Sequence, residues 1–363
     1  RDRGGGHPPD QISGFYKLIE APWTLVMIAP GKQILAPIIK FRFYYFICGM
    51  AFIILIVLLI RFVTGRTVSD IKQVSNAAEK VAGGDYHQIL PVKTRDEVGE
   101  LTLSFNTMVH QLEERMQMKE AMNLAMEVQQ NLLPAEMPRV KGLDIAGRSI
   151  YCDETGGDLF DFLELCCRDS DQIGIAVGDV SGHGISAALL MATVRAFLRM
   201  RVTQPGSPAE IINDVNRLVA HDTRETSQFV TLFYIEIDPT ERSISWIRAG
   251  HDPAMLYSPD SEIFVELKGT GIALGIESAY ECHAETISEL KKGQVLLIGT
   301  DGLWETQNDS GEMFGKDRLQ GLIRQSAHKS SQEIITVIVN ALETFRQSVK
   351  QDDDITLAVI KAK

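Results

Sequence analysis

Apolar residues follow three patterns along this chain, and the first is an uninterrupted run near the N-terminus. Residues 43–60 carry no charge, and the wider stretch 41–63 is apolar apart from Arg42 and Arg61. A run of this length can cross a bilayer as a helix. A cleaved signal peptide is not expected, because a long segment precedes the run and no small-residue cleavage pattern follows it. We therefore predict a transmembrane helix over residues 41–63.

The second pattern is a helical spacing of apolar residues in two consecutive segments. These residues are Val68, Ile71, Val74, Ala78 and Val81 in the first segment and Leu101, Phe105, Met108, Val109 and Leu112 in the second. Neither helix can bury its apolar stripe alone, so a partner chain is expected. With Asp96-Glu97-Val98-Gly99 opening the second helix, residues 61–115 resemble a HAMP domain, which implies a parallel four-helix bundle of two chains.

The second of these helices is predicted to continue to Leu133, before Pro134. Its stripe changes phase near Lys119, and a change of phase alters the winding of a coiled coil. We interpret residues 116–139 as a signalling helix and linker, with a merely solvated linker helix as the alternative. Residues 1–40 mix short apolar runs with glycines and prolines, which predicts strand and turn, and they resemble the C-terminal remnant of an extracytoplasmic Cache-type sensor.

The third pattern begins near residue 140, where short strand-like runs alternate with glycine turns and a few longer helical stretches. The predicted strands are 173–180, 229–237, 244–248, 263–267, 295–298 and 355–360, and the predicted helices are 185–202, 208–221 and 332–349. A segment of this size is ample for one hydrophobic core. We therefore expect residues 140–363 to form one α+β domain.

Composition narrows the possible partners. The chain has 363 residues, is 45% hydrophobic and carries a net charge of −12. No concentrated basic stripe offsets this charge, so a nucleic-acid partner is not expected. The five cysteines show no CxxC pair and no spacing typical of a disulfide framework, which fits a reducing cytosol.

The candidate chemistry lies in four acidic turns, each beside a strand or an apolar run. The turns are Gly156-Gly157-Asp158, Gly178-Asp179-Val180-Ser181-Gly182-His183-Gly184, Thr300-Asp301-Gly302 and Asp352-Asp353-Asp354-Ile355-Thr356. If the turns meet at one end of a sheet, their carboxylates repel one another unless cations neutralise them. Oxygen ligands without a His or Cys cluster favour Mg²⁺ or Mn²⁺ over zinc. Two such ions suit the hydrolysis of a phosphate ester.

These turns, together with Ala249-Gly250-His251-Asp252-Pro253, occur in the order seen in SpoIIE/RsbU-type phosphatases. Residues 140–363 thus resemble the PPM superfamily of metal-dependent protein serine/threonine phosphatases. The resemblance implies an α-β-β-α sandwich, in which two antiparallel sheets are flanked by helices. The expected fold class is therefore α+β, with this sandwich preceded by a transmembrane helix, a HAMP helical bundle and a coiled-coil linker.

The resemblance also implies a role for each acidic turn and two bound ions, Mn²⁺ or Mg²⁺. The catalytic residues would be Asp158, Asp179, Asp301 and Asp353, and the metal ligands would be these four with the Val180 carbonyl and Asp354. Asp179 would bridge the ions, and Asp353 and Asp354 are alternatives for the last ligand. A water molecule would attack phosphorus directly, without a phosphoenzyme.

Two departures from the family pattern and two histidines of open role remain. Eukaryotic relatives carry a His two residues after the bridging Asp, proposed as the general acid, and here that position is Ser181. His183 is nearby but offset, so the proton donor is not assigned. Leu159-Phe160 stand where family members often have Trp-Tyr. His251 is either a hydrogen-bonded turn residue or a catalytic one, and the turn residue is the expected reading.

Two alternatives compete with a phosphatase. The segment Gly156-Gly157-Asp158-Leu159-Phe160 resembles the loop of a diguanylate cyclase, but Leu159 stands where that enzyme needs Glu. A catalytically inactive, phosphatase-like module that binds a partner is the stronger alternative. We expect a dimeric, signal-regulated phosphatase in the inner membrane, with its catalytic domain in the cytoplasm. By resemblance, its substrate would be a phosphorylated STAS-type anti-sigma-factor antagonist.

Overall fold

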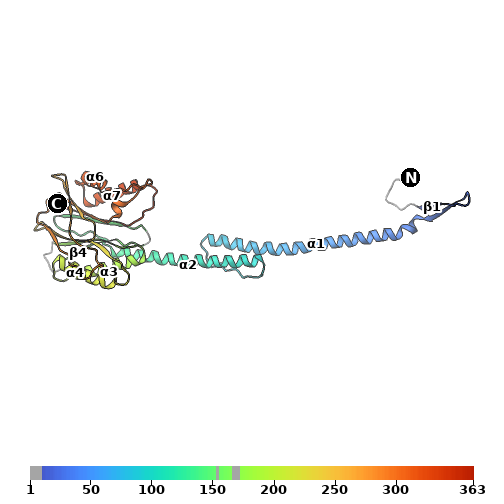
Figure 1. The fold of residues 1–363 in the computed structure, drawn as a ribbon, viewed down its shortest axis with the longest axis horizontal. Helices are drawn as coiled ribbons and strands as arrows, with labels where there is room; N and C mark the ends of the chain where they lie inside the picture. The colour runs from blue at the N-terminus through green and yellow to red at the C-terminus, as the bar shows by residue number, and fades with distance from the viewer. Residues whose placement is uncertain (1–9, 153–154, 166–171) are drawn as a thin grey trace. The chain divides into compact units, whose positions relative to one another are not determined.

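The computed structural model describes residues 10–152, 155–165 and 172–363 (Figure 1). The chain divides into two compact units, Arg1–Gln117 and Met118–Lys363. The Gly/Pro-rich start of the predicted sensor remnant, residues 1–9, lies outside the described residues.

The N-terminal unit begins with a hairpin and continues as a long helix. Strands β1 (Gln11–Lys17) and β2 (Thr24–Pro30) pair antiparallel, and α1 (Gly31–Ala82) follows at once. The prediction of strand and turn for residues 31–39 is therefore wrong, because Pro37 lies inside α1 without ending it. Among the described residues, α1 is the one helix long and apolar enough to cross a membrane, and its apolar window is not buried within the protein.

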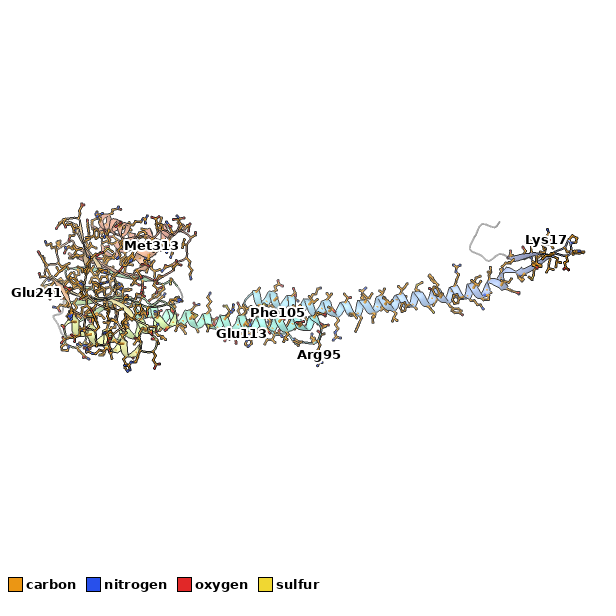
Figure 2. The ribbon with its side chains drawn as sticks, viewed as in Figure 1. Lys17, Arg95, Phe105, Glu113, Glu241 and Met313 are labelled. Atoms are coloured by element: carbon orange, nitrogen blue, oxygen red, sulfur yellow. The ribbon has the colours of Figure 1, made fainter. Side chains whose placement is uncertain are left out.

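A small apolar cluster joins the end of α1 to the start of α2 (Glu97–Leu132). Ala77 and Val81 of α1 pack with Phe105 and Val109 of α2. Figure 2 labels Phe105. The connector between the helices is held by Asn106, whose side chain bonds both backbone groups of Leu90: Oδ1 accepts from the N–H at 2.9 Å, and Nδ2 donates to the carbonyl at 2.8 Å.

The acidic start of α2 has a local physical reason. Oδ1 of Asp96 accepts from the N–H groups of Val98 and Gly99, both at 3.2 Å, which satisfies two otherwise unpaired donors of the first turn. A Cβ at position 99 would lie 2.0 Å from the Thr94 carbonyl oxygen, so this close turn requires glycine. These contacts explain the aspartate and the glycine of the Asp-Glu-x-Gly pattern.

The C-terminal unit contains the end of α2 and two antiparallel sheets of five strands each. One sheet has the order β10-β7-β6-β5-β4 and the other β3-β12-β11-β8-β9. The strands of the first sheet are β4 (Leu159–Glu164), β5 (Ile173–Val180), β6 (Val230–Asp238), β7 (Ser243–Ala249) and β10 (Glu285–Ile287). Those of the second are β3 (Leu143–Ile150), β8 (Ala254–Ser258), β9 (Ile263–Leu267), β11 (Val295–Gly299) and β12 (Ile355–Ala362).

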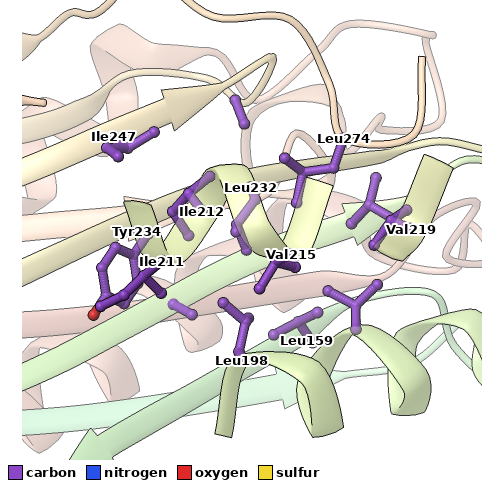
Figure 3. Close-up of a cluster of buried hydrophobic side chains, with 14 of the residues drawn as sticks. Leu159, Leu198, Ile211, Ile212, Val215, Val219, Leu232, Tyr234, Ile247 and Leu274 are labelled. Atoms are coloured by element: carbon purple, nitrogen blue, oxygen red, sulfur yellow. The ribbon is translucent and has the colours of Figure 1, made fainter. Parts of the chain in front are cut away.

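Helices cover the outer face of each sheet, so the layers run helix, sheet, sheet, helix. Helices α3 (Ile185–Arg201) and α4 (Pro208–Asp222) pack on the first sheet through the core drawn in Figure 3. Helices α6 (Lys316–Ser326) and α7 (Ser331–Arg346) pack on the second, and the one-turn helix α5 (Gly302–Glu305) follows β11. A third core fills the space between the sheets.

Burial on both faces explains why the strands read as continuous apolar runs. In β5, Ile175 and Val177 face the core between the sheets, whereas Ala176 and Val180 face α3 and α4. Successive side chains of a strand point to opposite faces, and here both faces are covered. The predicted α-β-β-α sandwich is confirmed, and the strand predictions 173–180 and 263–267 coincide with β5 and β9.

Candidate active site

The first two candidate aspartates lie at one corner of the first sheet. Asp158 directly precedes β4, and Asp179 is the next-to-last residue of β5. Because β4 and β5 pair antiparallel, the start of one strand meets the end of the other. A Cβ at Gly157 would lie 3.0 Å from the Val180 carbonyl oxygen and 3.5 Å from Oδ1 of Asp179. The corner therefore brings two carboxylates and a backbone carbonyl together.

The other candidate aspartates lie at the matching corner of the second sheet. Asp301 follows β11 after Thr300, and Asp353 precedes β12, the antiparallel neighbour of β11. A Cβ at Gly302 would lie 2.1 Å from the Asp354 carbonyl oxygen, so glycine is required for this approach. The two acidic turns of the second sheet are thus in contact through their backbones.

Thr300 links the two corners across the sandwich. Its hydroxyl donates to Oδ2 of Asp158 at 2.7 Å and accepts from the N–H of Thr356 at 3.0 Å. Asp158 belongs to the first sheet, whereas Thr300 and Thr356 belong to the second. Four acidic turns that are far apart in the sequence therefore meet at one edge of the sandwich.

Asp353 and Asp354 differ in what their side chains can do. Asp354 is buried, and both of its carboxylate oxygens accept from backbone N–H groups, that of Cys152 at 2.8 Å and that of Gly157 at 2.9 Å. Asp353 is exposed, and one of its oxygens accepts from the N–H of Asp354 at 2.8 Å. Asp354 thus anchors the Gly156-Gly157 turn, and Asp353 keeps oxygen atoms available to an ion.

Crowding raises the pKa of each carboxyl in the set proposed as catalytic. Desolvation at the crowded edge is the largest cause for each of them, although Asp353 is an exposed residue, and neighbouring carboxylates add to it. The pKa of Asp158 lies well above its usual value, with Asp179 and Asp354 as the charged neighbours. Burial and the charges of Asp301, Asp353 and Asp354 raise the pKa of Asp179 to about 7. The pKa values of Asp301 and Asp353 are raised as well.

The donor atoms at this edge fit a hard divalent cation. Within residues 10–152, 155–165 and 172–363, no group of three or more His, Cys, Asp and Glu side chains is arranged so as to hold a metal ion by itself. Mg²⁺ does not need such a group, because it keeps several water ligands and binds through one or two carboxylates. The edge offers carboxylates and a carbonyl, all hard oxygen donors, and its carboxylates raise the pKa of one another. Both properties favour cation binding.

His251 is a buried structural residue at the same edge. Its Nδ1 lies 2.9 Å from the Thr231 hydroxyl and its Nε2 lies 3.1 Å from the Gly299 carbonyl oxygen, so the ring joins β6 to β11. Burial lowers the pKa of His251 to about 4, which keeps the ring neutral near pH 7. The neutral ring donates to Gly299 and accepts from Thr231. This geometry is that of the hydrogen-bonded turn residue expected from the sequence.

The turn after Asp179 provides no assigned proton donor. The Ser181 hydroxyl accepts from the N–H of Phe229 at 2.9 Å, and the Ser181 N–H donates to the Phe229 carbonyl at 2.9 Å. Ser181 thus extends the pairing of β5 with the segment before β6. His183 is exposed between Gly182 and Gly184, both of which have positive φ.

Two contacts near the site were not anticipated from the sequence. The buried Asp161 of β4 forms ion pairs with Arg195 and Arg199 of α3, and the distances from their Nε atoms are 3.1 Å and 2.6 Å. Gln129 of α2 bonds the backbone of Gly156, beside Asp158. Neither contact has a local sequence signal, because each joins residues far apart along the chain.

Comparison with known families decides the classification. The family model of Stage II sporulation protein E (SpoIIE) matches residues 169–363, which is more than half of the chain. The chain belongs to the SpoIIE family. A HAMP domain model matches residues 62–114, which confirms the HAMP resemblance.

Relatives of this SpoIIE-family chain include a protein named as a phosphoserine phosphatase. Phosphoserine phosphatase RsbU of Bacillus subtilis is 30% identical over 247 residues, which cover 68% of this chain and 71% of RsbU. The solved structure of the SiaA-PP2C domain of Pseudomonas aeruginosa is 22% identical to this chain and superposes with a TM-score of 0.59. The match covers 69% of this chain and 99% of that domain, and it shows that the two share a fold.

A third relative combines two domains. The structure of the RsbU and RsbW domains of Rv1364c from Mycobacterium tuberculosis is 30% identical with a TM-score of 0.51, and the match covers 62% of this chain and 61% of that one. Together, these matches identify the SpoIIE-family chain as a protein serine/threonine phosphatase of the PPM type. Its long apolar helix and HAMP domain are typical of a membrane-anchored protein.

Proposed function

We propose that this chain is a membrane-bound, signal-regulated phosphatase that uses two divalent cations, Mn²⁺ or Mg²⁺, to remove phosphate from serine or threonine of a partner protein. One observation carries the proposal: Asp158, Asp179, Asp301 and Asp353 come from four separate turns and gather at one edge of the sandwich with raised pKa values. Crowded carboxylates repel one another, and a bound cation relieves that repulsion.

The proposed ligand set follows from which oxygen atoms are available. Asp179 would bridge the two ions, with the Val180 carbonyl and Asp158 serving the same cluster. Asp301 and Asp353 would complete the coordination of the second ion. Asp353 is preferred over Asp354 because both oxygens of Asp354 are already bonded to backbone N–H groups.

The protein's own residues would then hold this set in place. Two bound ions would supply an activated water and neutralise the charge of the phosphoryl group. Thr300 orients Asp158 through its hydroxyl, and His251, neutral and bonded on both ring nitrogens, fixes the Gly299 carbonyl two residues before Asp301. No proton donor to the leaving group is assigned, although the Ser181 hydroxyl, which accepts from the N–H of Phe229, keeps its own proton.

The proposed substrate is a phosphorylated STAS-type anti-sigma-factor antagonist. Its support is similarity to RsbU, whose name gives it as a phosphoserine phosphatase. We further propose that the chain forms a parallel homodimer through the HAMP helices and the linker. In this proposal α1 crosses the inner membrane, the phosphatase unit lies in the cytoplasm, and the HAMP bundle switches between packings in response to a signal.

Phosphate release by the full chain in lipid nanodiscs tests the proposal. With Mn²⁺ and a serine-phosphorylated STAS-type protein, the wild type should release phosphate, and a chelator should stop it. Asp179→Asn and Asp301→Asn should each lower kcat on the order of 10³-fold, because each removes part of a charge-stabilising site worth several kcal/mol. Asp352→Asn, an exposed neighbouring acid, is the matched control and should retain activity.

Two outcomes would overturn the proposal. If Asp179→Asn and Asp301→Asn release phosphate at the wild-type rate, the aspartates do not hold the catalytic ions. If the folded wild type releases none with Mn²⁺ or Mg²⁺, the alternative of an inactive binding module is correct.

A further inference from the structure

The edge of the sandwich opposite the acidic one contains a cavity with basic walls. Strand β11 ends and β12 begins at the acidic edge, and the two strands pair antiparallel, so the start of β11 and the end of β12 meet at the other edge. A cavity of about 390 Å³ opens there. Three segments that are far apart in the sequence supply its basic side chains, which are Lys292, His328, Lys329, Lys361 and Lys363.

Hydrogen bonds fix the walls of this basic cavity. The Gly293 N–H donates to the Ala362 carbonyl at 2.8 Å, which holds the segment before β11 against the end of β12. Nζ of Lys361 donates to the Lys329 carbonyl at 2.8 Å, which ties β12 to the loop before α7. Lys361 and Lys363 are two residues apart at the end of β12, so their side chains point to the same face. The fold therefore gathers basic residues that the sequence scatters.

The cavity carries an excess of positive charge, although the whole chain has a net charge of −12. Asp144 is the one carboxylate among the lining residues, and both of its oxygens are engaged: Oδ1 lies 3.3 Å from Nζ of Lys363, and Oδ2 accepts from the Ser331 N–H at 2.8 Å. Within the described part of the chain, neither Lys292 nor Lys329 pairs with a carboxylate. Four lysines against one carboxylate leave three positive charges in excess.

The N-terminus of α7, which borders the cavity, is already satisfied by the protein. The Ser330 hydroxyl accepts from the Glu333 N–H at 3.3 Å, and the Glu333 carboxylate accepts from the Ser330 N–H at 2.9 Å. The Ser331 N–H is bonded to Asp144. This capping box uses the backbone donors and the nearby charge of Glu333. The lysine ammonium groups are therefore the feature that distinguishes the cavity, and the end of the helix is not.

The charge and size of the cavity indicate the kind of molecule that fits. Lysine binds phosphate as a point charge. A phosphate group carries roughly 1.5 to 2 negative charges at pH 7, so three excess positive charges match a molecule with two such groups. The volume of about 390 Å³ is typical of small-molecule sites, whereas a lipid surface needs a flat face and no cavity.

We propose that the basic cavity binds a small soluble molecule that carries at least two phosphate groups, of the nucleoside diphosphate kind. The site is separate from the acidic edge, because β11 and β12 span the distance between the two edges. The inference is therefore independent of the proposed phosphatase activity. Lys292 and Lys329, which have no carboxylate partner, would contribute most to binding.

Isothermal titration of the full chain with pyrophosphate tests the proposal. The chain would be held in nanodiscs of neutral phosphatidylcholine and freed of metal ions, so that neither an anionic lipid nor a cation at the acidic edge binds the probe or competes with it. Lys292→Gln and Lys329→Gln each remove one charge from the cavity. Lys291→Gln is the matched control, because Lys291 is exposed, is not a lining residue and lies 3.8 Å from Glu289.

The wild type should bind one pyrophosphate per chain with a Kd below about 1 mM. Lys292→Gln and Lys329→Gln should each weaken binding about fivefold or more, because a pair of unit charges about 4 Å apart in water is worth about 1 kcal/mol. Lys291→Gln should bind as the wild type does, and added salt should weaken binding in every case.

Four results would overturn the inference. The wild type could fail to bind pyrophosphate, or Lys292→Gln and Lys329→Gln could bind it with unchanged affinity. Inorganic phosphate could bind as tightly as pyrophosphate, which would exclude a site for two phosphate groups. Nanodiscs with phosphatidylglycerol could abolish pyrophosphate binding, which would assign the basic residues to a lipid surface. None of these results depends on whether the chain hydrolyses phosphoserine.

Discussion

The two units of this chain differ in what they expose: the N-terminal unit exposes apolar surface, and the phosphatase unit crowds negative charge at one edge. The N-terminal unit leaves apolar surface uncovered: Leu58 of α1 is 60% exposed, and Met108, in the apolar stripe of α2, is 45% exposed. The phosphatase unit builds three buried cores, although Leu189 and Ile276 stay exposed, and it crowds carboxylates at the edge that contains Asp179. The first unit therefore suits lipid and a second chain, and the second suits cations.

The largest expected difference between the units is in their response to loss of a large apolar side chain. Phe233 of β6 is fully buried between the sheets, so Phe233→Ala should lower the free energy of unfolding of the phosphatase unit by about 3–5 kcal/mol. Leu58→Ala should leave that value unchanged. Denaturant unfolding of the full chain in detergent, followed by phosphatase activity, measures both. If both substitutions lowered the free energy of unfolding equally, the contrast between the two units would be wrong.

The next effect concerns charge in the metal-free protein. Folding raises the pKa of Asp179 from 3.8 to about 7, so between these values the folded state binds more protons than the unfolded state. Stability should therefore fall as the pH rises through this window, by up to about 4 kcal/mol. Asp179→Asn removes this dependence and should make the metal-free protein more stable than the wild type at pH 8.

Adding Mn²⁺ should make the wild type more stable than Asp179→Asn at pH 8, because the ions stabilise the wild type and not the variant. Thermal unfolding of the wild type and of Asp179→Asn, at pH 5 and pH 8 and with either chelator or Mn²⁺, measures these differences. A wild type whose metal-free stability does not change between these pH values would show that the carboxylates are not under electrostatic stress.

The smallest effect on catalysis is expected at the proposed interface between the HAMP helices of two chains. Met108 shares the apolar stripe of Phe105 and Leu112 yet remains exposed in the single chain. Met108→Glu should weaken self-association at least tenfold, or about 1.4 kcal/mol, and leave the turnover of a small aryl phosphate nearly unchanged. Thr107→Glu, at an exposed position beside it, is the control. Mass photometry in detergent reads the oligomeric state, and an unchanged dimer would place the interface elsewhere.

Most of the sandwich could be predicted because its strands are buried on both faces. The run at residues 173–180 is continuous and apolar, and it is β5. The helix α6 was missed, since Lys316–Ser326 is rich in charged and polar residues and has a glycine at position 321. Strand β4 was missed because Asp161 interrupts its apolar pattern, and only the ion pairs with Arg195 and Arg199 explain a buried acid there.

The sequence places the candidate acidic residues beside turns, but it does not predict how the environments of Asp353 and Asp354 differ. Asp353 and Asp354 are identical in sequence terms, and only their environments separate them: Asp354 is bonded to the backbone of Cys152 and Gly157, and Asp353 is exposed. Thr300 and Gln129 bond residues 142 and 27 positions away in the sequence, respectively, and one sequence carries no signal for such contacts.

Anomalous scattering from a crystal of the protein soaked in Mn²⁺ tests the central claim most directly. The account predicts two manganese peaks at the edge of the sandwich, with Asp179 in contact with both and with Asp158, Asp301 and Asp353 around them. A well-ordered acidic edge without manganese, or manganese bound only at another surface, would contradict it.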